Sequence, residues 1–422
     1  MQNISTLKRW SVPLIAALFF YYEFIQMNMM NSLNDSLSQT FHVGAEMLGG
    51  LSSYYFIANL IFLFPAGIIL DRFSTRRVVL IALAICIIGT FLFSQSTDLG
   101  WAKVFRFATG IGSAFCFLSC IRLATRWLPS KQLALASGII VTLAMLGGWT
   151  AQGPLTLLIN AIGWRHAIVA DAGLGVIIFI AIALWVRDRP DHVEEVHQQE
   201  LSELHTLGFW HSLQRSYLNL QNWLCGIYTN MMNLPVFIVG AIFGIPYLTQ
   251  AHGMSVNSAA FISGMIFFGT VIGSPLAGFF SDALKQRRLP MQIGTLLSFV
   301  IFAAILYLPN IGVLGFAALF FLIGLTTSTQ IISYPLVAET NPKLLTATCV
   351  SVVSFNVISG GAIFQPLVGK LLDAGWQGKI LNGHHVYSAH DYKSAFSILM
   401  IAFVVALVAT FFMKESRCQA VD

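Results

Sequence analysis

Residues 67–77 read GIILDRFSTRR, and residues 278–288 read GFFSDALKQRR. The glycine, the aspartate and the two closing arginines of the first stretch all return 211 positions later, which is half the length of this 422-residue chain. Both stretches are short charged loops between long apolar runs. A charged loop that repeats at half-length indicates two copies of one membrane unit, an organisation typical of secondary transporters.

The composition supports a membrane protein. Hydrophobic residues make up 56% of the chain and charged residues 10%, whereas soluble domains carry roughly 25% charged residues. The net charge of +5 forms no basic patch beside stacking aromatics, so we expect no nucleic-acid partner. We therefore expect most of this chain to lie in a lipid bilayer.

Twelve apolar runs approach the roughly 20 residues that a spanning helix needs. We therefore predict an all-α membrane protein with twelve transmembrane helices in two pseudo-symmetric six-helix bundles, residues 1–186 and 221–422. A polar cytoplasmic linker at 187–220 joins them, with some amphipathic helix. The expected spans are 11–31, 47–70, 78–96, 101–121, 133–159, 165–186, 222–248, 258–281, 290–308, 311–334, 344–372 and 394–413.

Lysine and arginine placement predicts the direction of the spans. With the N-terminus in the cytoplasm, 17 of the 23 basic residues lie on the cytoplasmic side, which is the bias that membrane insertion favours. Both termini are therefore expected in the cytoplasm. The first apolar run is too long for a cleaved signal peptide and is interpreted as a retained anchor.

Cysteines and histidines give no indication of a metal site or a cofactor. The six cysteines form no C-x-x-C pair. Four residues gather in the outer loop before the last span, but their spacing is irregular, and a solvated loop is the favoured interpretation: His384, His385, His390 and Asp391.

Three segments resemble the major facilitator superfamily. The repeated loop resembles its signature between helices 2 and 3, Arg106–Gly112 resembles the R-x-x-x-G-x-G pattern of helix 4, and Gly147–Pro154 resembles the glycine-proline stretch of helix 5. The resemblance implies alternating access by a monomer. It also implies a conformational latch, formed by residues of the two repeated loops, that must open in one state: Gly67, Asp71, Arg72, Arg76, Arg77, Gly278, Asp282, Arg287 and Arg288.

A narrower likeness is carried by Phe20–Phe24, Gly244–Leu248, Ala338–Pro342 and Gln365–Asp373. These look like the bacterial phagosomal nutrient transporters, which are similar to the lysosomal dipeptide transporter branch. The likeness implies a bacterial inner membrane and a substrate such as an amino acid or a peptide, and some relatives handle siderophores. Gln26 stands where that group often has an arginine.

Ionisable residues inside apolar spans are costly and point to function. Glu23 lies midway along the first span and is a candidate proton carrier, and Asp171 is the other buried acid. Arg106 could bind an anionic substrate or neutralise one of these acids, and both possibilities stay open. Helices 1, 4, 7 and 10 line the cavity in this family, with 5 and 11 beside them. The candidate substrate-binding residues on these helices are Tyr22, Gln26, Asn28, Arg106, Gln152, Tyr228, Asn230, Asn233, Gln330, Tyr334, Asn356 and Gln365.

We therefore expect a proton-coupled secondary transporter of a small polar organic solute, such as an amino acid, a peptide or a similar metabolite. A siderophore or drug transporter is the alternative. The chain has no phosphate-binding glycine loop and no nucleophile–base constellation, so neither an ATP-driven pump nor an enzyme is expected. A membrane receptor would need a sizeable effector domain, and the tail after Met413 is short.

Overall fold

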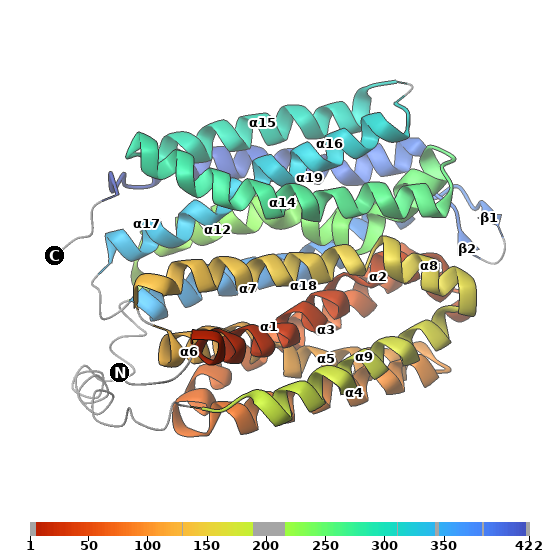
Figure 1. Ribbon diagram of the computed structural model, residues 1–422. Helices are drawn as coiled ribbons and strands as arrows, with labels where there is room; N and C mark the ends of the chain where they lie inside the picture. Colours follow the sequence, from red (N-terminus) through yellow and green to blue (C-terminus); the bar gives the residue numbers. More distant parts are fainter. Residues whose placement is uncertain are drawn as a thin grey trace. The chain divides into compact units, whose positions relative to one another are not determined.

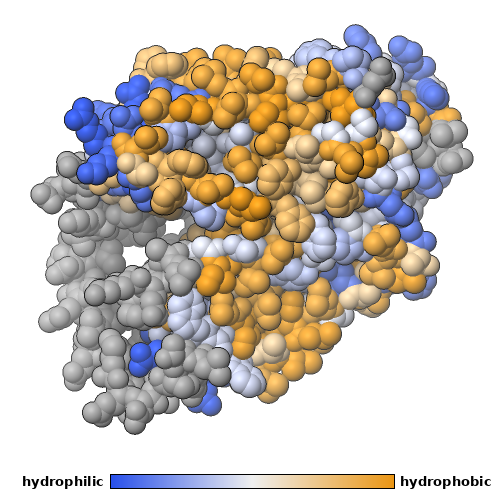
Figure 2. All heavy atoms as spheres, turned by 45° about the horizontal axis from the view of Figure 1, so that its top comes forward, coloured by the Kyte–Doolittle hydropathy of each residue, from blue (hydrophilic) through white to orange (hydrophobic). Residues whose placement is uncertain are grey.

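The computed structural model describes residues 6–128, 130–188, 216–309, 311–341, 346–381 and 384–418, and these are predominantly helical (Figure 1). The expected amphipathic helix in the linker lies outside the described residues. Hydrophobic side chains dominate the flanks of the helices, and hydrophilic ones gather toward their ends (Figure 2). This distribution suits helices whose sides face lipid.

The first half of the chain begins with long apolar helices interrupted at three places. The helices are α1 (Thr6–Asn28), α2 (Met30–Phe41), α3 (Ala45–Arg72), α4 (Thr75–Gln95), α5 (Leu99–Ser113), α6 (Cys116–Trp127), α7 (Ser130–Thr150), α8 (Gly153–Ile162) and α9 (Trp164–Trp185). The interruptions after Asn28, Ser113 and Thr150 divide three of the expected spans into consecutive helices.

The second half contains π-helical and 3₁₀-helical segments as well as α-helices. Its elements are α12 (Leu220–Pro235), the π-helical η1 (Val236–Phe243), α13 (Gly244–Pro246), the π-helical η2 (Tyr247–Ala251), α14 (Val256–Leu284), α15 (Arg288–Tyr307), α16 (Val313–Thr327), the 3₁₀ turn η3 (Ser328–Ile332), α17 (Ser333–Thr340), α18 (Thr346–Gly375) and α19 (Ala389–Phe412). A two-residue hairpin, β1 (Ile380–Leu381) with β2 (His384–His385), precedes α19 and pairs Ile380 with His385.

The predicted all-α membrane architecture is confirmed. Among the described residues, ten helical segments are long and apolar enough to cross a membrane. The remaining two expected spans, 47–70 and 133–159, coincide with α3 and with α7 followed by α8.

Packing divides the chain into two compact units. The first comprises Met1–Pro190, Phe237–Phe267 and Ala362–Ala395, and the second comprises Asp191–Val236, Phe268–Gly361 and Phe396–Asp422. The core of the first unit surrounds α1 and includes Phe19, Leu83 and Cys120, which are fully buried. Segments of the second half of the sequence thus pack with the first-half helices.

Glycines set how closely the helices of the first unit approach. A Cβ atom on Gly110 of α5 would lie 2.2 Å from the Tyr55 carbonyl oxygen of α3, and one on Gly147 of α7 would lie 2.1 Å from the Tyr21 carbonyl oxygen of α1. Only glycine permits such contacts between helix backbones. These two crossings hold α3 and α5 together and α1 against α7, and so position the residues described next.

Candidate functional site

A buried arginine and a buried glutamate lie within the first unit. Glu23 of α1 and Arg106 of α5 are 3% and 0% exposed. The Arg106 Nη1 atom donates to the Gln26 carbonyl oxygen at 2.9 Å, and its guanidinium lies 4.8 Å from the centre of the Tyr55 ring. Glu23 and Arg106 lie close enough to interact electrostatically. The predicted proton carrier and the predicted cation therefore share one cluster.

Part of this cluster has no hydrogen-bond partner among the described residues. The Nε and Nη2 atoms of Arg106 and the Oε2 atom of Glu23 are buried, and no described group hydrogen-bonds to them. A buried polar atom without a partner costs roughly 1–3 kcal/mol, and more when the group is charged. Two N–H groups of one guanidinium are the donors with which arginine binds a carboxylate in a bidentate manner. The arrangement is suited to a small anion.

Gln26 connects the second acid to the same region. Its Nε2 atom donates to Asp171 of α9, and its Oε1 atom accepts from the Thr90 hydroxyl of α4 at 2.9 Å. Asp171 is 6% exposed. Gln26 of α1 therefore contacts both groups, Asp171 through its side chain and Arg106 through its backbone carbonyl.

Amide side chains satisfy the backbone of the π-helical region around 236–251. Gln152 donates to the Gly240 carbonyl oxygen at 2.9 Å, and Gln365 donates to that of Phe237 at 2.9 Å. Pro246 has no N–H to donate to the Ile242 carbonyl four residues earlier, and Asn34 donates to it instead at 3.0 Å. The structure thus places the predicted substrate-binding residues Gln152 and Gln365 on the backbone of this segment.

Asn31 is a central residue that the sequence reasoning missed. Its amide nitrogen lies within hydrogen-bond distance of Gln152, of the Val239 and Gly240 carbonyl oxygens and of the Ser263 hydroxyl, and its Oδ1 atom accepts from the Ile245 backbone. It is 1% exposed. The only sequence signal was one more polar residue at the end of an apolar span, eight positions after Glu23.

The second unit contributes polar but uncharged candidates. The Tyr228 hydroxyl donates to the Met291 carbonyl oxygen at 3.1 Å and lies 3.0 Å from the Thr329 hydroxyl. The Asn230 side chain lies against Gly360, and no described residue hydrogen-bonds to its Oδ1 atom. Two of the other predicted residues bond within their own helices, Asn233 to Thr229 and Asn356 to Val352. Tyr334 is partly buried in this unit, and the Oε1 atom of Gln330 has no partner among the described residues. Asn28 of the first unit likewise donates to Phe24.

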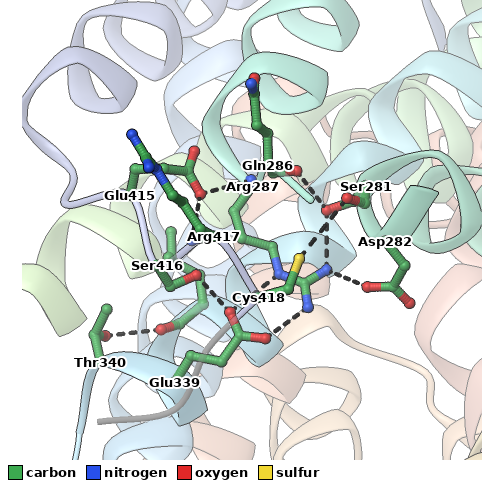
Figure 3. A network of polar contacts seen from close by, with 11 residues as sticks. Ser281, Asp282, Gln286, Arg287, Glu339, Thr340, Glu415, Ser416, Arg417 and Cys418 are labelled. Atoms are coloured by element: carbon green, nitrogen blue, oxygen red, sulfur yellow. Dashed lines mark hydrogen bonds and ion pairs between the residues drawn. The ribbon is translucent and has the colours of Figure 1, made fainter. Parts of the chain in front are cut away.

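The second copy of the repeated loop forms an ion-pair network within the second unit (Figure 3). The Arg287 guanidinium contacts Asp282 at 2.7 Å and Glu339 at 2.6 Å. Burial alone would lower the pKa of Arg287, but hydrogen bonds and charge from Glu339 and Asp282 outweigh it and raise the pKa. Ser416 of the tail also donates to Glu339, at 2.5 Å. Predicted latch residues are therefore joined to each other and to the tail.

A carboxylate also caps the helix that follows each loop, which the sequence reasoning missed. Glu415 accepts from the Arg287 and Arg288 backbone N–H groups at 2.9 and 2.8 Å, at the start of α15. Asp188 accepts from the Arg76 backbone N–H at 2.7 Å, at the start of α4. Each acid lies three residues after the end of a helix, α19 or α9. The side chains of Asp71 and Arg72 lie outside what the structure describes.

The described members of the outer-loop histidine cluster form no metal-binding group. The His385 ring stacks on Trp376 at 3.7 Å between centroids, whereas Asp391 accepts from the Ser388 backbone at the start of α19. Asp373 caps the start of α3 by accepting from the Ala45 and Glu46 backbone at 3.1 and 2.8 Å. The His384 side chain lies outside the described residues.

Comparison with known proteins identifies the relatives of this chain. The model of the Major Facilitator Superfamily matches residues 14–245 and 225–420. The "Probable galactarate/D-glucarate transporter GarP" of Escherichia coli (strain K12) is 25% identical over 89% of this chain and 88% of its own length. The "Probable sulfoacetate transporter SauU" of Cupriavidus necator is 26% identical, but the match spans 52% of this chain and 53% of that protein.

Solved structures share the fold. An inward-facing bacterial homologue of the human lysosomal transporter Spinster aligns over 97% of both chains with a TM-score of 0.80 and 17% identity. A D-xylose–proton symporter aligns over 97% of this chain and 99% of its own with a TM-score of 0.74 and 14% identity. The predicted fold and family are confirmed.

Proposed function

Because the chain belongs to the Major Facilitator Superfamily and is a secondary transporter, not an enzyme, we propose that it carries a small organic acid together with a proton by alternating access. The sequence predicted a small polar organic solute. We propose more specifically that this solute bears a carboxylate or a similar anionic group. The observation that carries the proposal is the fully buried Arg106 with two unpartnered N–H positions.

The charges in the first unit link anion binding to proton uptake. Arg106 supplies one positive charge, whereas Glu23 and Asp171 supply up to two negative ones. One protonated acid therefore makes this buried set neutral, which is the state that a low-dielectric interior favours. An anion bound to Arg106 adds a negative charge, and this favours a proton on the remaining carboxylate. We infer that Glu23 takes it, since its Oε2 atom is buried and unpartnered.

The relatives support an anionic substrate. The names of the two relatives include galactarate and D-glucarate in one case and sulfoacetate in the other, all of them organic acids.

The proposed setting follows from the distribution of basic residues. We place the protein as a monomer in the bacterial inner membrane with both termini in the cytoplasm, because this orientation puts 17 of the 23 basic residues inside. The two repeated loops then lie on the cytoplasmic side, where the Arg287 network would act as a latch that breaks in the alternate state.

Binding measurements with purified protein test the substrate class. We expect galactarate or sulfoacetate to raise the unfolding temperature, and an uncharged sugar of similar size to leave it unchanged. Arg106→Gln should abolish the shift and Arg106→Lys should weaken it, since lysine lacks the planar pair of donors. Lys103→Gln is the matched control, because Lys103 lies one turn away on α5 over the Tyr54 ring. An undiminished shift in Arg106→Gln would refute the assignment.

A further inference from the structure

An open groove lies in the first unit between the start of α4 and the end of α9. The two helices pack against each other and lie side by side in Figure 1. The groove has a volume of about 560 Å³ and is lined by Ser74, Arg76, Arg77, Leu80, Leu184, Val186, Arg187 and Asp188. Three guanidinium groups and one carboxylate line it, so its walls carry two excess positive charges (3 − 1).

The single carboxylate that lines the groove, that of Asp188, already accepts hydrogen bonds from the protein. Asp188 accepts from the Ser74 hydroxyl and from the Arg76 backbone N–H, and the Arg76 guanidinium donates to the Ala183 carbonyl oxygen. Arg77 and Arg187 are exposed, and no described residue pairs with either side chain. Two cations at the groove therefore have no counter-charge among the described residues.

The second copy of the loop differs at this point. Arg288 is the sequence counterpart of Arg77, and its guanidinium donates to the Thr410 and Phe411 carbonyl oxygens at 2.9 and 3.1 Å. Arg288 is thus bound to the end of α19, whereas the Arg77 guanidinium has no partner among the described residues. The two loops have similar sequences, yet their second arginines differ in their contacts. Among the described residues, the unpaired arginine is therefore specific to the first half of the chain.

The groove also has an apolar wall that continues along the helices. Leu184 is 75% exposed, and Trp185 beside it is 60% exposed. Further along, Ile81 of α4 and Ile177 of α9 are exposed as well. A tryptophan at the end of a spanning helix typically lies at the level of the lipid headgroups. The arginines are therefore placed at headgroup depth with an exposed hydrophobic surface leading into the membrane.

We propose that this groove binds an anionic phospholipid. Its phosphate would lie between Arg77 and Arg187, and its acyl chains would run along Leu80 and Leu184. Basic pockets beside spanning helices bind anionic headgroups through charge-assisted hydrogen bonds. A soluble anion would use the arginines and leave the apolar wall uncovered, so the observations favour a lipid.

Lipid binding by the full-length protein in detergent tests the proposal. Native mass spectrometry with dioctanoyl phosphatidylglycerol should show a bound lipid. Arg77→Gln and Arg187→Gln should each weaken it by about fivefold, and the double variant by about 25-fold. The double Arg→Lys variant should retain most of the binding, since it keeps both charges. Lys285→Gln is the control, because Lys285 is exposed and lies outside the groove.

Two further probes separate the contributions of charge and chains. Dioctanoyl phosphatidylcholine has the same chains without net charge, and glycerol 3-phosphate has the anion without chains. Both should bind much more weakly than phosphatidylglycerol. Equal binding of phosphatidylcholine would overturn the role of the arginines, and equal binding of glycerol 3-phosphate would overturn the lipid assignment. Unchanged phosphatidylglycerol affinity in a folded double Arg→Gln variant would place the lipid elsewhere and refute the proposed site.

Discussion

Arg106 is buried more completely than a merely topological arginine would be. Its Nη1 atom donates to the Gln26 carbonyl oxygen, and its guanidinium rests against the Tyr55 ring. Both contacts orient the guanidinium without neutralising it. A buried charge is costly unless it is paired, so Arg106 needs a compensating group, which we assign to Glu23 and to the substrate in turn.

Glu23→Gln tests the proton step at this scale. Glutamine keeps the shape and hydrogen-bonding capacity of the side chain but cannot release a proton. We expect the variant to lose accumulation driven by a pH gradient in proteoliposomes while it retains counterflow exchange of substrate. Asp171→Asn provides the comparison, because Asp171 is held by Gln26. If Glu23→Gln accumulates substrate as the wild type does, Glu23 is not the coupling acid.

At the scale of the element, the close crossing of α3 and α5 fixes Tyr55 beside Arg106. Gly110→Val would force the backbones apart, because a Cβ atom at 110 would lie 2.2 Å from the Tyr55 carbonyl oxygen. We expect a lower unfolding temperature and weaker anion binding. Gly50→Ala on α3 is the control, since a Cβ atom there meets nothing within 4 Å. Equal behaviour of the two variants would contradict this packing account.

The carboxylate cap of α15 gives an element-scale prediction with a pH dependence. Partial burial opposes ionisation of Glu415, but the backbone N–H groups of Arg287, Arg288 and Arg417 outweigh it and lower its pKa. A depressed pKa adds stability that is complete above the usual glutamate value of about 4.3 and is lost as the pH falls through the folded-state value.

Glu415→Gln should therefore lower the unfolding temperature at neutral pH, with a loss of about 1 kcal/mol typical of a helix cap. The difference from wild type should stay constant between about pH 6 and 8 and shrink only below about pH 4, measured by thermal unfolding in detergent. A difference that vanishes already near pH 6 would exclude an ionised Glu415 as its cause.

The sequence predicted the spanning helices and their charged residues better than it predicted which side chains contact each other. Glu23 and Arg106 could be singled out because charged residues are rare in apolar spans. The roles of Asn31, Gln152 and Gln365 could not, because they depend on which carbonyl groups the π-helical turns leave free. A spanning helix is apolar on all sides, so its sequence does not specify which face meets which neighbour.

At the scale of the whole molecule, the two halves share more than the repeated loop. Each half also has an acidic residue at an equivalent place, which no sequence motif indicated. Asp188 and Glu415 each follow a helix by three residues and cap the helix after a repeated loop. The boundaries of the two compact units could not be predicted from the sequence, because Phe237–Phe267 and Ala362–Ala395 belong to the same unit as the first-half helices. Long-range packing of this kind leaves no periodic trace in the sequence.

The central claim is that an organic anion and a proton move together. Its most direct test is uptake of a radiolabelled organic acid, galactarate or sulfoacetate, into proteoliposomes with an acidic exterior and a neutral interior. We expect the wild-type protein to concentrate the acid inside, and a protonophore to reduce the internal level to equilibrium with the outside. Accumulation that is indifferent to both the pH gradient and the protonophore would contradict the account.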